Sequence, residues 1–265
     1  MFSKAIIRPP GANYADGLTI VAPGKLDYTR ALGQHTAYCE VLEACGLELT
    51  RLAADERFPD SAFVEDTAVI VRELAAGRTS APQVILTRPG AASRIGEVES
   101  IKEPLSVFCP QLKSIHEPGT LDGGDVCEAA QHFFIGISER TNEAGAEQLA
   151  ELLSGCGYTS SLVDIRNVKD LLHLKSGLAY LGDNRLVVIE ALANLKEFHG
   201  YELVHVPAGE EYAANCVRIN DQVLIAAGYP VFERTLRDLG YKTSVLEMSE
   251  FQKMDGGLSC LSLRF

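Results

Sequence analysis

The 265-residue sequence contains no tryptophan and no apolar run that approaches the roughly 18–20 residues of a membrane-spanning helix. Its N-terminal stretch, MFSKAIIRPPGANYADG, reaches charge and proline before an apolar segment of useful length, so we expect no secretory signal. Basic residues are scarce, because 24 Lys and Arg stand against 36 Asp and Glu and give a formal net charge of −12. Nucleic acids and anionic membranes attract basic surfaces, so we expect a cytoplasmic protein that binds neither.

Paired cysteine motifs are also absent. The seven cysteines are widely scattered, and none belongs to a Cys-x-x-Cys pair. An odd number excludes complete pairing within one chain, and the scatter argues against a structural zinc site. We therefore expect free thiols and a reducing compartment. The length is ample for a hydrophobic core, so no disulfide or metal is needed for folding.

Helical and β-rich stretches alternate along the chain. Apolar spacings of three and four predict helices at 28–47, 91–105, 141–158, 193–201 and 231–241, and all but the second end at a glycine. A short β-rich run follows each helix, at 47–52, 112–117, 159–165, 202–207 and 243–248. A polar turn and a hairpin-like pair of strands come next, for example at 68–73, 125–138, 179–190 and 216–228.

This repeated order predicts an α/β fold of about five units, each of 265/5 = 53 residues on average. Five units that close on themselves form a five-bladed α/β propeller, with strands around an axis and helices outside. We expect residues 1–265 to form one catalytic domain of this kind. A two-domain α/β protein is the alternative.

The polar turns occupy the same place in each unit, at 57–67, 118–126, 170–177, 210–216 and 253–260. In a closed pseudo-symmetric ring, equivalent turns converge on the axis. The side chains expected to meet there are Asp60, Glu65, Asp66, Asp122, Asp125, His173 and Cys260. This set contains a nucleophile, a base and carboxylates, as thiol-based covalent catalysis requires.

Two of these residues are candidates for proton transfer and nucleophilic attack. Cys260 lies in a glycine-rich turn, which allows close approach of a ligand, although a lone cysteine is more often a small buried apolar residue. His173 lies in the apolar segment LLHLKSG and has the alternative of a hydrogen-bonded structural role. Opposite a cysteine and an acid, it would instead transfer protons near neutral pH.

The carboxylates suggest a cationic ligand. In LDGGD, Asp122 and Asp125 flank two glycines; either one of them orients the histidine, or both serve a tight hairpin entry. Asp60, Glu65 and Asp66 are interleaved with aromatic residues in FPDSAFVED. Carboxylates among aromatic rings suit a planar cation such as a guanidinium. Arg88 and Arg140 each follow a strand and are either surface charges or a clamp for an α-carboxylate.

At these residues the chain resembles the dimethylarginine dimethylaminohydrolases of the guanidine-modifying, or pentein, superfamily. Matching segments run over nearly the whole length: DGLT (16–19), DERFPDSAFVED (55–66), LTRPGAASR (86–94), GTLDGGDV (119–126), RTNEAGAEQL (140–149), HLKSGLAY (173–180), AANC (213–216) and DGGLSCLSLRF (255–265). The resemblance implies a five-bladed α/β propeller without metal or other cofactor. It also implies hydrolysis of methylated arginine to citrulline and an amine.

The resemblance assigns roles to individual residues. It implies that Cys260 is the nucleophile, that His173 is the general acid and base, and that Asp122 is the acid partner of the histidine, where some bacterial relatives have Glu. The implied guanidinium and side-chain pocket consists of Leu18, Asp60, Phe63, Glu65 and Asp66. Arg88 and Arg140 match the clamp on the substrate's carboxylate. The segment 11–25, which includes Leu18, is expected to form a lid, and a homodimer is plausible for this family.

Other functions stay open at this point. Arginine deiminases of the same superfamily are longer and carry His-x-Asp where this chain has His173-Leu174-Lys175, which disfavours free arginine as the substrate. Arginine, agmatine or another guanidine is the alternative substrate. A catalytically silent arginine-binding module and a purely structural repeat protein are alternatives of a different class.

Overall fold

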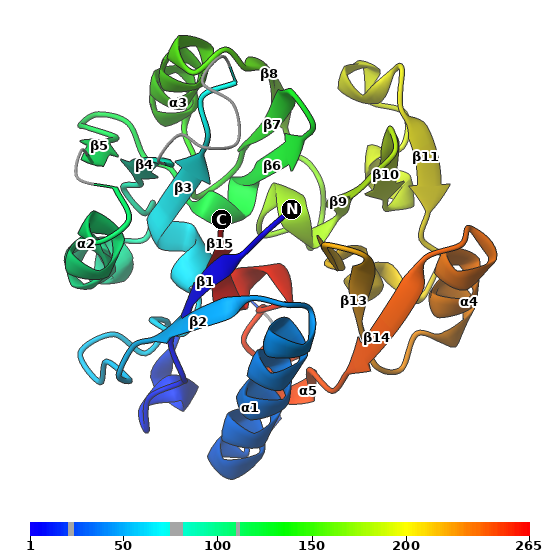
Figure 1. The fold of residues 1–265 in the computed structure, drawn as a ribbon, viewed down its shortest axis with the longest axis horizontal. Helices are drawn as coiled ribbons and strands as arrows, with labels where there is room; N and C mark the ends of the chain where they lie inside the picture. Colours follow the sequence, from blue (N-terminus) through cyan, green and yellow to red (C-terminus); the bar gives the residue numbers. More distant parts are fainter. Residues whose placement is uncertain (21–23, 75–81, 110–111) are drawn as a thin grey trace.

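Among the residues that the structure describes (1–20, 24–74, 82–109 and 112–265), five three-stranded sheets stand around a central axis (Figure 1). This arrangement comes from a computed structural model. In each sheet two strands are antiparallel and the third runs parallel to the middle strand. In spatial order the sheets are β15 (Ser262–Arg264), β1 (Lys4–Ile7) and β2 (Glu48–Arg51); β3 (Ala68–Val71), β4 (Gln83–Leu86) and β5 (Leu112–Ser114); β6 (Val126–Ala129), β7 (His132–Ile137) and β8 (Thr159–Asp164); β9 (Leu178–Gly182), β10 (Arg185–Val188) and β11 (Glu202–His205); β12 (Val217–Ile219), β13 (Gln222–Ala226) and β14 (Lys242–Leu246).

A parallel third strand requires a crossover, because the chain must return to the end of the sheet from which the middle strand started. Helices provide it in four sheets, at the periphery of the ring: α1 (Tyr28–Ala44), α2 (Glu99–Ser106), α3 (Glu143–Gly155) and α4 (Pro230–Asp238) (Figure 1). The side chains of Asp27 and Asn142 cap α1 and α3 by accepting hydrogen bonds from backbone amides of the first turn. A fifth helix, α5 (Ser249–Gln252), is a single turn. In the described parts of the chain, no helix combines the length and hydropathy of a membrane span.

Two predicted helices differ from the structure. The stretch 91–105 begins as a 3-10 helix, η3 (Ala92–Val98), and becomes α2 only afterwards. The predicted helix at 193–201 is wrong: the crossover of the fourth sheet consists of two 3-10 turns, η6 (Glu190–Leu192) and η7 (Lys196–Phe198). Its apolar anchors Leu192, Leu195 and Phe198 recur every three residues, which fits the three residues per turn of a 3-10 helix.

The predicted polar turns are 3-10 turns that lead directly into the first strand of a sheet. They are η2 (Val64–Thr67), η4 (Gly123–Asp125), η5 (Leu174–Ser176), η8 (Glu211–Ala214) and η9 (Ser259–Leu261). Contacts join η9 to η2, η2 to η4, η4 to η5 and η5 to η8. The convergence of the predicted turns is thus confirmed, and the predicted order of elements is confirmed except for the helix of the fourth unit.

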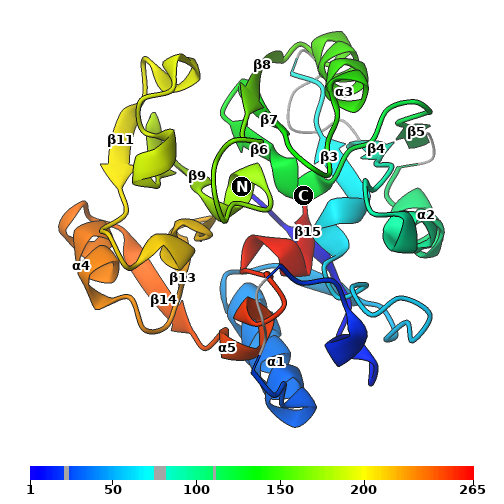
Figure 2. The same ribbon diagram turned by 180° about the vertical axis from the view of Figure 1, so that it is seen from behind.

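The ring is closed by strands from opposite ends of the sequence. Strand β15 pairs antiparallel with β1, with Ala5 opposite Arg264. The backbone amides of Ser3 and Lys4 donate to the Phe265 carbonyl at 3.0 and 2.9 Å. Both marked chain ends lie near the middle of the ring when it is seen from the front and from behind (Figure 2). Because the last strand completes the first sheet, this sheet forms only when the two chain segments meet.

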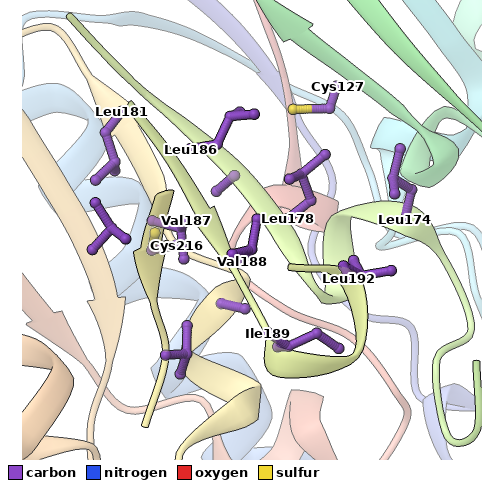
Figure 3. Close-up of a cluster of buried hydrophobic side chains, with 14 of the residues drawn as sticks. Cys127, Leu174, Leu178, Leu181, Leu186, Val187, Val188, Ile189, Leu192 and Cys216 are labelled. Carbon is purple, nitrogen blue, oxygen red and sulfur yellow. The ribbon is translucent and has the colours of Figure 1, made fainter. Parts of the chain in front are cut away.

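The core consists of apolar clusters between the sheets and around the helices. The largest surrounds β9 and β10, with Leu178, Leu186 and Val188 fully buried (Figure 3). Leu174, in the turn after His173, belongs to the same cluster and is also fully buried. This packing anchors the backbone that carries the histidine.

Candidate active site

Two cavities are lined by neighbouring residues of the same three turns, η2, η5 with His173 before it, and η9; these turns are called the floor here. Their side chains separate into two sets, one on each side: Asp66, His173 and Cys260 line a small cavity, called the thiol cavity here, whereas Glu65, Lys175 and Ser259 line a larger one, called the axial cavity. The thiol cavity measures ≈ 30 Å³ and the axial cavity ≈ 620 Å³. The axial cavity is bounded mainly by the first strands of the sheets. Successive residues of one turn therefore line different cavities.

His173 is oriented by a buried carboxylate. Its Nε2 lies 3.0 Å from Oδ2 of Asp122, and the other Asp122 oxygen accepts from the Gly90 amide at 2.9 Å. The second aspartate of LDGGD has a different role, because Asp125 accepts from the Leu174 amide at 2.9 Å and thereby fixes the next turn. Of the two aspartates, it is Asp122 that contacts the histidine.

The histidine is protonated at neutral pH. Burial by itself lowers the pKa of His173, but Asp66, Asp122 and Asp125 outweigh this effect and raise the pKa to about 9. The ring is packed tightly against Gly124, where an added Cβ would lie 2.7 Å from Nδ1. The imidazole is therefore a positioned proton donor.

Asp66 is an ionised carboxylate in the same cavity. One of its oxygens accepts from Arg94 Nη1 at 2.6 Å and the other from the Gly124 amide at 2.8 Å. Burial alone raises the pKa of Asp66, whereas His173 and Arg94 lower it to about 2. Arg94 is itself buried and also pairs with Glu97 at 2.8 Å. A negative charge thus persists beside the cysteine, where it can attract a cation.

Cys260 is a thiol in the resting protein. Burial raises the pKa of Cys260 to about 12, and the nearby charges of Glu65 and Asp66 contribute in the same direction. A thiolate is the reactive form, so the site needs an incoming positive charge to favour it. Two of the other cysteines, Cys127 and Cys216, lie in the apolar cluster of Figure 3.

The walls of the thiol cavity include most of the predicted pocket residues. Leu18, Asp60, Phe63 and Arg140 line it, and the Leu18 amide donates to both Asp60 oxygens at 3.0 and 3.2 Å. Burial raises the pKa of Asp60. Of the predicted lid at 11–25, residues 21–23 lie outside the described residues.

Two predicted pocket residues lie elsewhere. Glu65 precedes Asp66 in one turn and faces the opposite side of the floor, where it pairs with Lys175 at 2.6 Å and Arg264 at 3.0 Å. Arg88 is absent from the described lining of the thiol cavity, and its guanidinium instead pairs with Glu117 at 2.6 Å. The structure therefore does not bring Glu65 or Arg88 into the cavity with Cys260.

Comparison with known proteins places this site in a family. A family model described as arginine deiminase matches residues 108–209. The dimethylarginine dimethylaminohydrolase of Pseudomonas aeruginosa is 42% identical over 266 residues that cover 100% of both chains. The enzyme of the same name from Streptomyces coelicolor is 35% identical over 98% of this chain and 96% of its own. The chain belongs to the dimethylarginine dimethylaminohydrolase family.

Solved structures agree with this assignment. A cysteine-to-serine mutant of the P. aeruginosa dimethylarginine dimethylaminohydrolase, complexed with citrulline, superposes with a TM-score of 0.92 at 41% identity, and all of both chains is covered. The N-terminal domain of ArgZ, an arginine dihydrolase from cyanobacteria, shares the fold with a TM-score of 0.84 at 17% identity over 100% of this chain and 97% of its own. The family's five-bladed α/β propeller is therefore confirmed for this chain.

Several residues at or next to the thiol cavity have no role in the sequence prediction. Arg94 lies in the matched segment LTRPGAASR, but nothing in that segment distinguishes a buried arginine from a surface one. Asn215 occupies the repeat position equivalent to His173 and Cys260; its Oδ1 accepts from the Ser259 amide at 2.9 Å, and its Nδ2 donates to the Lys175 carbonyl at 3.0 Å. It therefore ties the turn of the nucleophile to that of the histidine. Further unpredicted residues of the cavity wall are Leu172, Met254, Asp255 and Gly256.

Three side chains of the site also have the spacing of metal ligands. Ligand atoms of Asp66, Asp122 and His173 lie within 4.8 Å of one another. Arg94 already occupies one oxygen of Asp66, and a protonated imidazole has no lone pair for a metal. These groups suit an organic cation better than a metal ion, and a metal-free reaction stays our prediction.

Proposed function

We propose that this chain hydrolyses Nω-methylated arginines, including asymmetric dimethylarginine, to citrulline and methylamine or dimethylamine. The observation that carries this proposal is the meeting of an ionised carboxylate, a protonated histidine and a thiol in one cavity. They are Asp66, His173 and Cys260. Membership of the dimethylarginine dimethylaminohydrolase family supports the same substrate class.

The substrate cation would activate its own nucleophile. Ionised Asp66 offers its charge to the guanidinium, with hydrogen bonds strengthened by opposite charges. A cation beside the Cys260 sulfur opposes the effects of burial, Glu65 and Asp66, and it therefore lowers the pKa of the thiol from about 12. Binding and thiolate formation are coupled, which restricts reactivity to the occupied site.

The reaction then proceeds through a covalent intermediate. The Cys260 thiolate adds to the guanidinium carbon, and His173 protonates the departing amine, which leaves a planar S-alkylthiouronium. His173, now neutral, removes a proton from water, and the hydroxide formed adds to the same carbon. Collapse of this adduct releases citrulline and the thiolate, and the hydroxyl proton of the adduct passes to the released amine or to water. His173 keeps the proton that it took from water and is ready for the next cycle. Asp122 holds the imidazole during both proton transfers.

The rest of the substrate would lie along the cavity wall. Leu18, Asp60 and Phe63 would enclose its side chain. Arg140 lines the cavity and is suited to the α-carboxylate, whereas Arg88 would have to leave Glu117 to contribute. Glu65 would act from the far side of the floor and without contact to the guanidinium.

Citrulline formation from asymmetric dimethylarginine tests the proposal directly. The wild-type chain should release citrulline and dimethylamine in equal amounts, and Cys260→Ser should release almost none. Cys45→Ser is the matched control, because Cys45 is a free and partly exposed cysteine outside the thiol cavity. Wild-type turnover by Cys260→Ser would contradict the covalent scheme.

A different guanidine is the second candidate substrate, because a model described as arginine deiminase matches part of the chain. A panel of arginine, agmatine, monomethylarginine and asymmetric dimethylarginine separates the two. Higher kcat/KM for arginine, with ammonia as the product, would favour the alternative.

We further propose that the protein functions in the cytoplasm and forms a homodimer. Seven free cysteines are consistent with a reducing compartment. Cell fractionation tests the location, and light scattering coupled to size exclusion tests the assembly. Recovery of the protein outside the cytoplasmic fraction would contradict the proposed location. A mass equal to that of one chain would contradict the homodimer.

A further inference from the structure

The Cys260 thiol must lose a proton before it attacks, and the groups around the thiol cavity are poor acceptors. His173 already carries its proton at neutral pH. Asp66 accepts hydrogen bonds from Arg94 and the Gly124 amide, and its pKa is about 2. The bound substrate is itself a cation. Asp60, a further carboxylate in the lining of this cavity, already accepts from the Leu18 amide with both oxygens.

The proton of Cys260 has another path, through the floor. Ser259 Oγ lies 3.9 Å from Cys260 Sγ and donates to Glu65 Oε2 at 2.8 Å. Ser259 and Glu65 line the axial cavity, whereas Cys260 lines the thiol cavity. We propose that Ser259 and Glu65 form a proton relay that carries the Cys260 proton through the floor to the axial cavity. The relay rests on the proposed function, since it is needed only when a bound cation draws the thiol into its ionised form.

The hydrogen bonds around Ser259 leave one position for the thiol. A serine hydroxyl has one proton to donate and two lone pairs to accept. Its proton goes to Glu65, and one lone pair accepts from Asn215 Nδ2 at 3.1 Å. The second lone pair is available to the S–H of Cys260. The Asn215 contacts hold the hydroxyl in this orientation, because its Oδ1 also accepts from the Ser259 amide.

The two oxygens of Glu65 have different partners. Lys175 Nζ lies 2.6 Å from Oε1 and Arg264 Nη2 lies 3.0 Å from the same oxygen. The other oxygen, Oε2, is the one that receives the Ser259 proton. Glu65 also lines the axial cavity, so a proton that arrives on Oε2 has a way out through that cavity.

Atoms and charges balance in this step. The S–H bond of Cys260 breaks and its proton binds Ser259 Oγ, while the original hydroxyl proton of Ser259 moves to Glu65 Oε2. The serine is unchanged, the thiolate gains the negative charge, and the carboxylate becomes neutral. Water then accepts the proton from Glu65. The reverse transfer reprotonates the thiolate after citrulline leaves.

Alkylation of Cys260 by chloroacetamidine, a cationic reagent that needs the thiolate, tests the relay without turnover. We expect Ser259→Ala to be alkylated at least about tenfold more slowly at neutral pH, whereas Ser259→Thr, which keeps the hydroxyl, restores most of the rate. Glu65→Gln should be equally slow, and added formate, a small base that the axial cavity admits, should accelerate it. Chemical rescue of this kind does not follow from a displaced turn.

Wild-type alkylation rates in Ser259→Ala or in Glu65→Gln would overturn the relay. Slow alkylation that neither the threonine hydroxyl nor formate restores would also overturn it. If Glu65→Gln does not fold, as judged by circular dichroism, the alanine and threonine variants of Ser259 decide between the outcomes. Failure of the wild-type chain to release citrulline from asymmetric dimethylarginine would instead contradict the proposed function and is measured separately.

Discussion

Neighbouring residues of the floor have different electrostatic surroundings on its two sides. On the thiol side, the charges of Asp66 and His173 face a small cavity with the sulfur of Cys260. On the axial side, Glu65 is matched by Lys175 and Arg264 in a cavity of ≈ 620 Å³. Both sets contain paired charges, but only the thiol side combines them with a nucleophile. We therefore expect the substrate to bind in the smaller cavity and not in the larger one.

Loss of the thiol should be the largest effect on the thiol side. Cys260→Ser is expected to lower kcat about 10⁴-fold or more, because no other group can form the covalent intermediate. Steady-state citrulline release measures the effect. Cys216→Ser changes a cysteine of the apolar cluster and should retain turnover; a similar loss there would indicate a folding defect and not a chemical one.

Substitutions of the adjacent carboxylates Asp66 and Glu65 should change different kinetic constants. Asp66→Asn removes the charge that faces the substrate and should lower kcat/KM about 10²-fold, mainly through KM. Glu65→Gln should leave KM close to the wild-type value and slow the thiol step instead. Steady-state kinetics of both variants provide the comparison. A raised KM in Glu65→Gln would place Glu65 with the substrate.

Protonation of His173 predicts a basic limit for activity and for part of the stability. Turnover should decline as pH rises through about 9, where the imidazole loses the proton that it donates to the amine. The pKa of His173 is raised from 6.5 to about 9 on folding, so its stabilising charge is fully present below pH 6.5 and is lost as pH rises through 9. Relative to His173→Gln, the wild-type Tm should therefore fall between about pH 6 and about pH 10.

A constant difference in Tm between wild type and His173→Gln across this range would contradict the assignment. Asp66 does not interfere with the reading, because its pKa of about 2 lies far below the range.

Asn215→Ala should weaken the connection between the turn of Cys260 and the turn of His173. It removes hydrogen bonds to Ser259 and Lys175 and should cost about 1–3 kcal/mol of unfolding free energy. Urea denaturation measures the loss. Asn215→Asp keeps the acceptor for the Ser259 amide but removes the donor to Lys175, so an intermediate stability is expected. A wild-type free energy of unfolding in Asn215→Ala would show that the Asn215 hydrogen bonds do not stabilise the fold.

The smallest effects should come from the two arginines. Arg140→Gln should raise KM more than Arg88→Gln, because Arg140 lines the thiol cavity and Arg88 is paired with Glu117. Loss of the Arg88–Glu117 ion pair should change the free energy of unfolding by only about 0–1 kcal/mol. Equal KM increases in both variants would show that Arg88 moves into the clamp when substrate binds.

The repeat and its converging turns were predictable because they depend on element order. Helix, strand, polar turn and hairpin each leave a local pattern, and closure of the ring brings equivalent turns together. The sequence could not predict which cavity the side chains of Glu65 and Asp66 line. One residue along a 3-10 turn rotates the side chain by about a third of a circle, and no sequence pattern marks which of the two faces the ligand.

Residues that act through buried networks were also missed for a physical reason. The sequence shows Arg94 as one arginine among many, and only the folded chain places it between Asp66 and Glu97. The fourth crossover was misassigned because apolar spacing of three fits the first turns of either helix type. Long-range burial, and not local propensity, decided both cases.

Closure of the ring also orders events during synthesis. Residue Ala5 pairs with Arg264, so the first sheet waits for a segment made some 259 residues later, that is 264 − 5. Cys260 lies in the same late segment, directly before β15. A nascent chain that has already formed the Asp66 and His173 turns therefore still lacks its thiol. The site gains its reactive sulfur together with the strand that closes the ring.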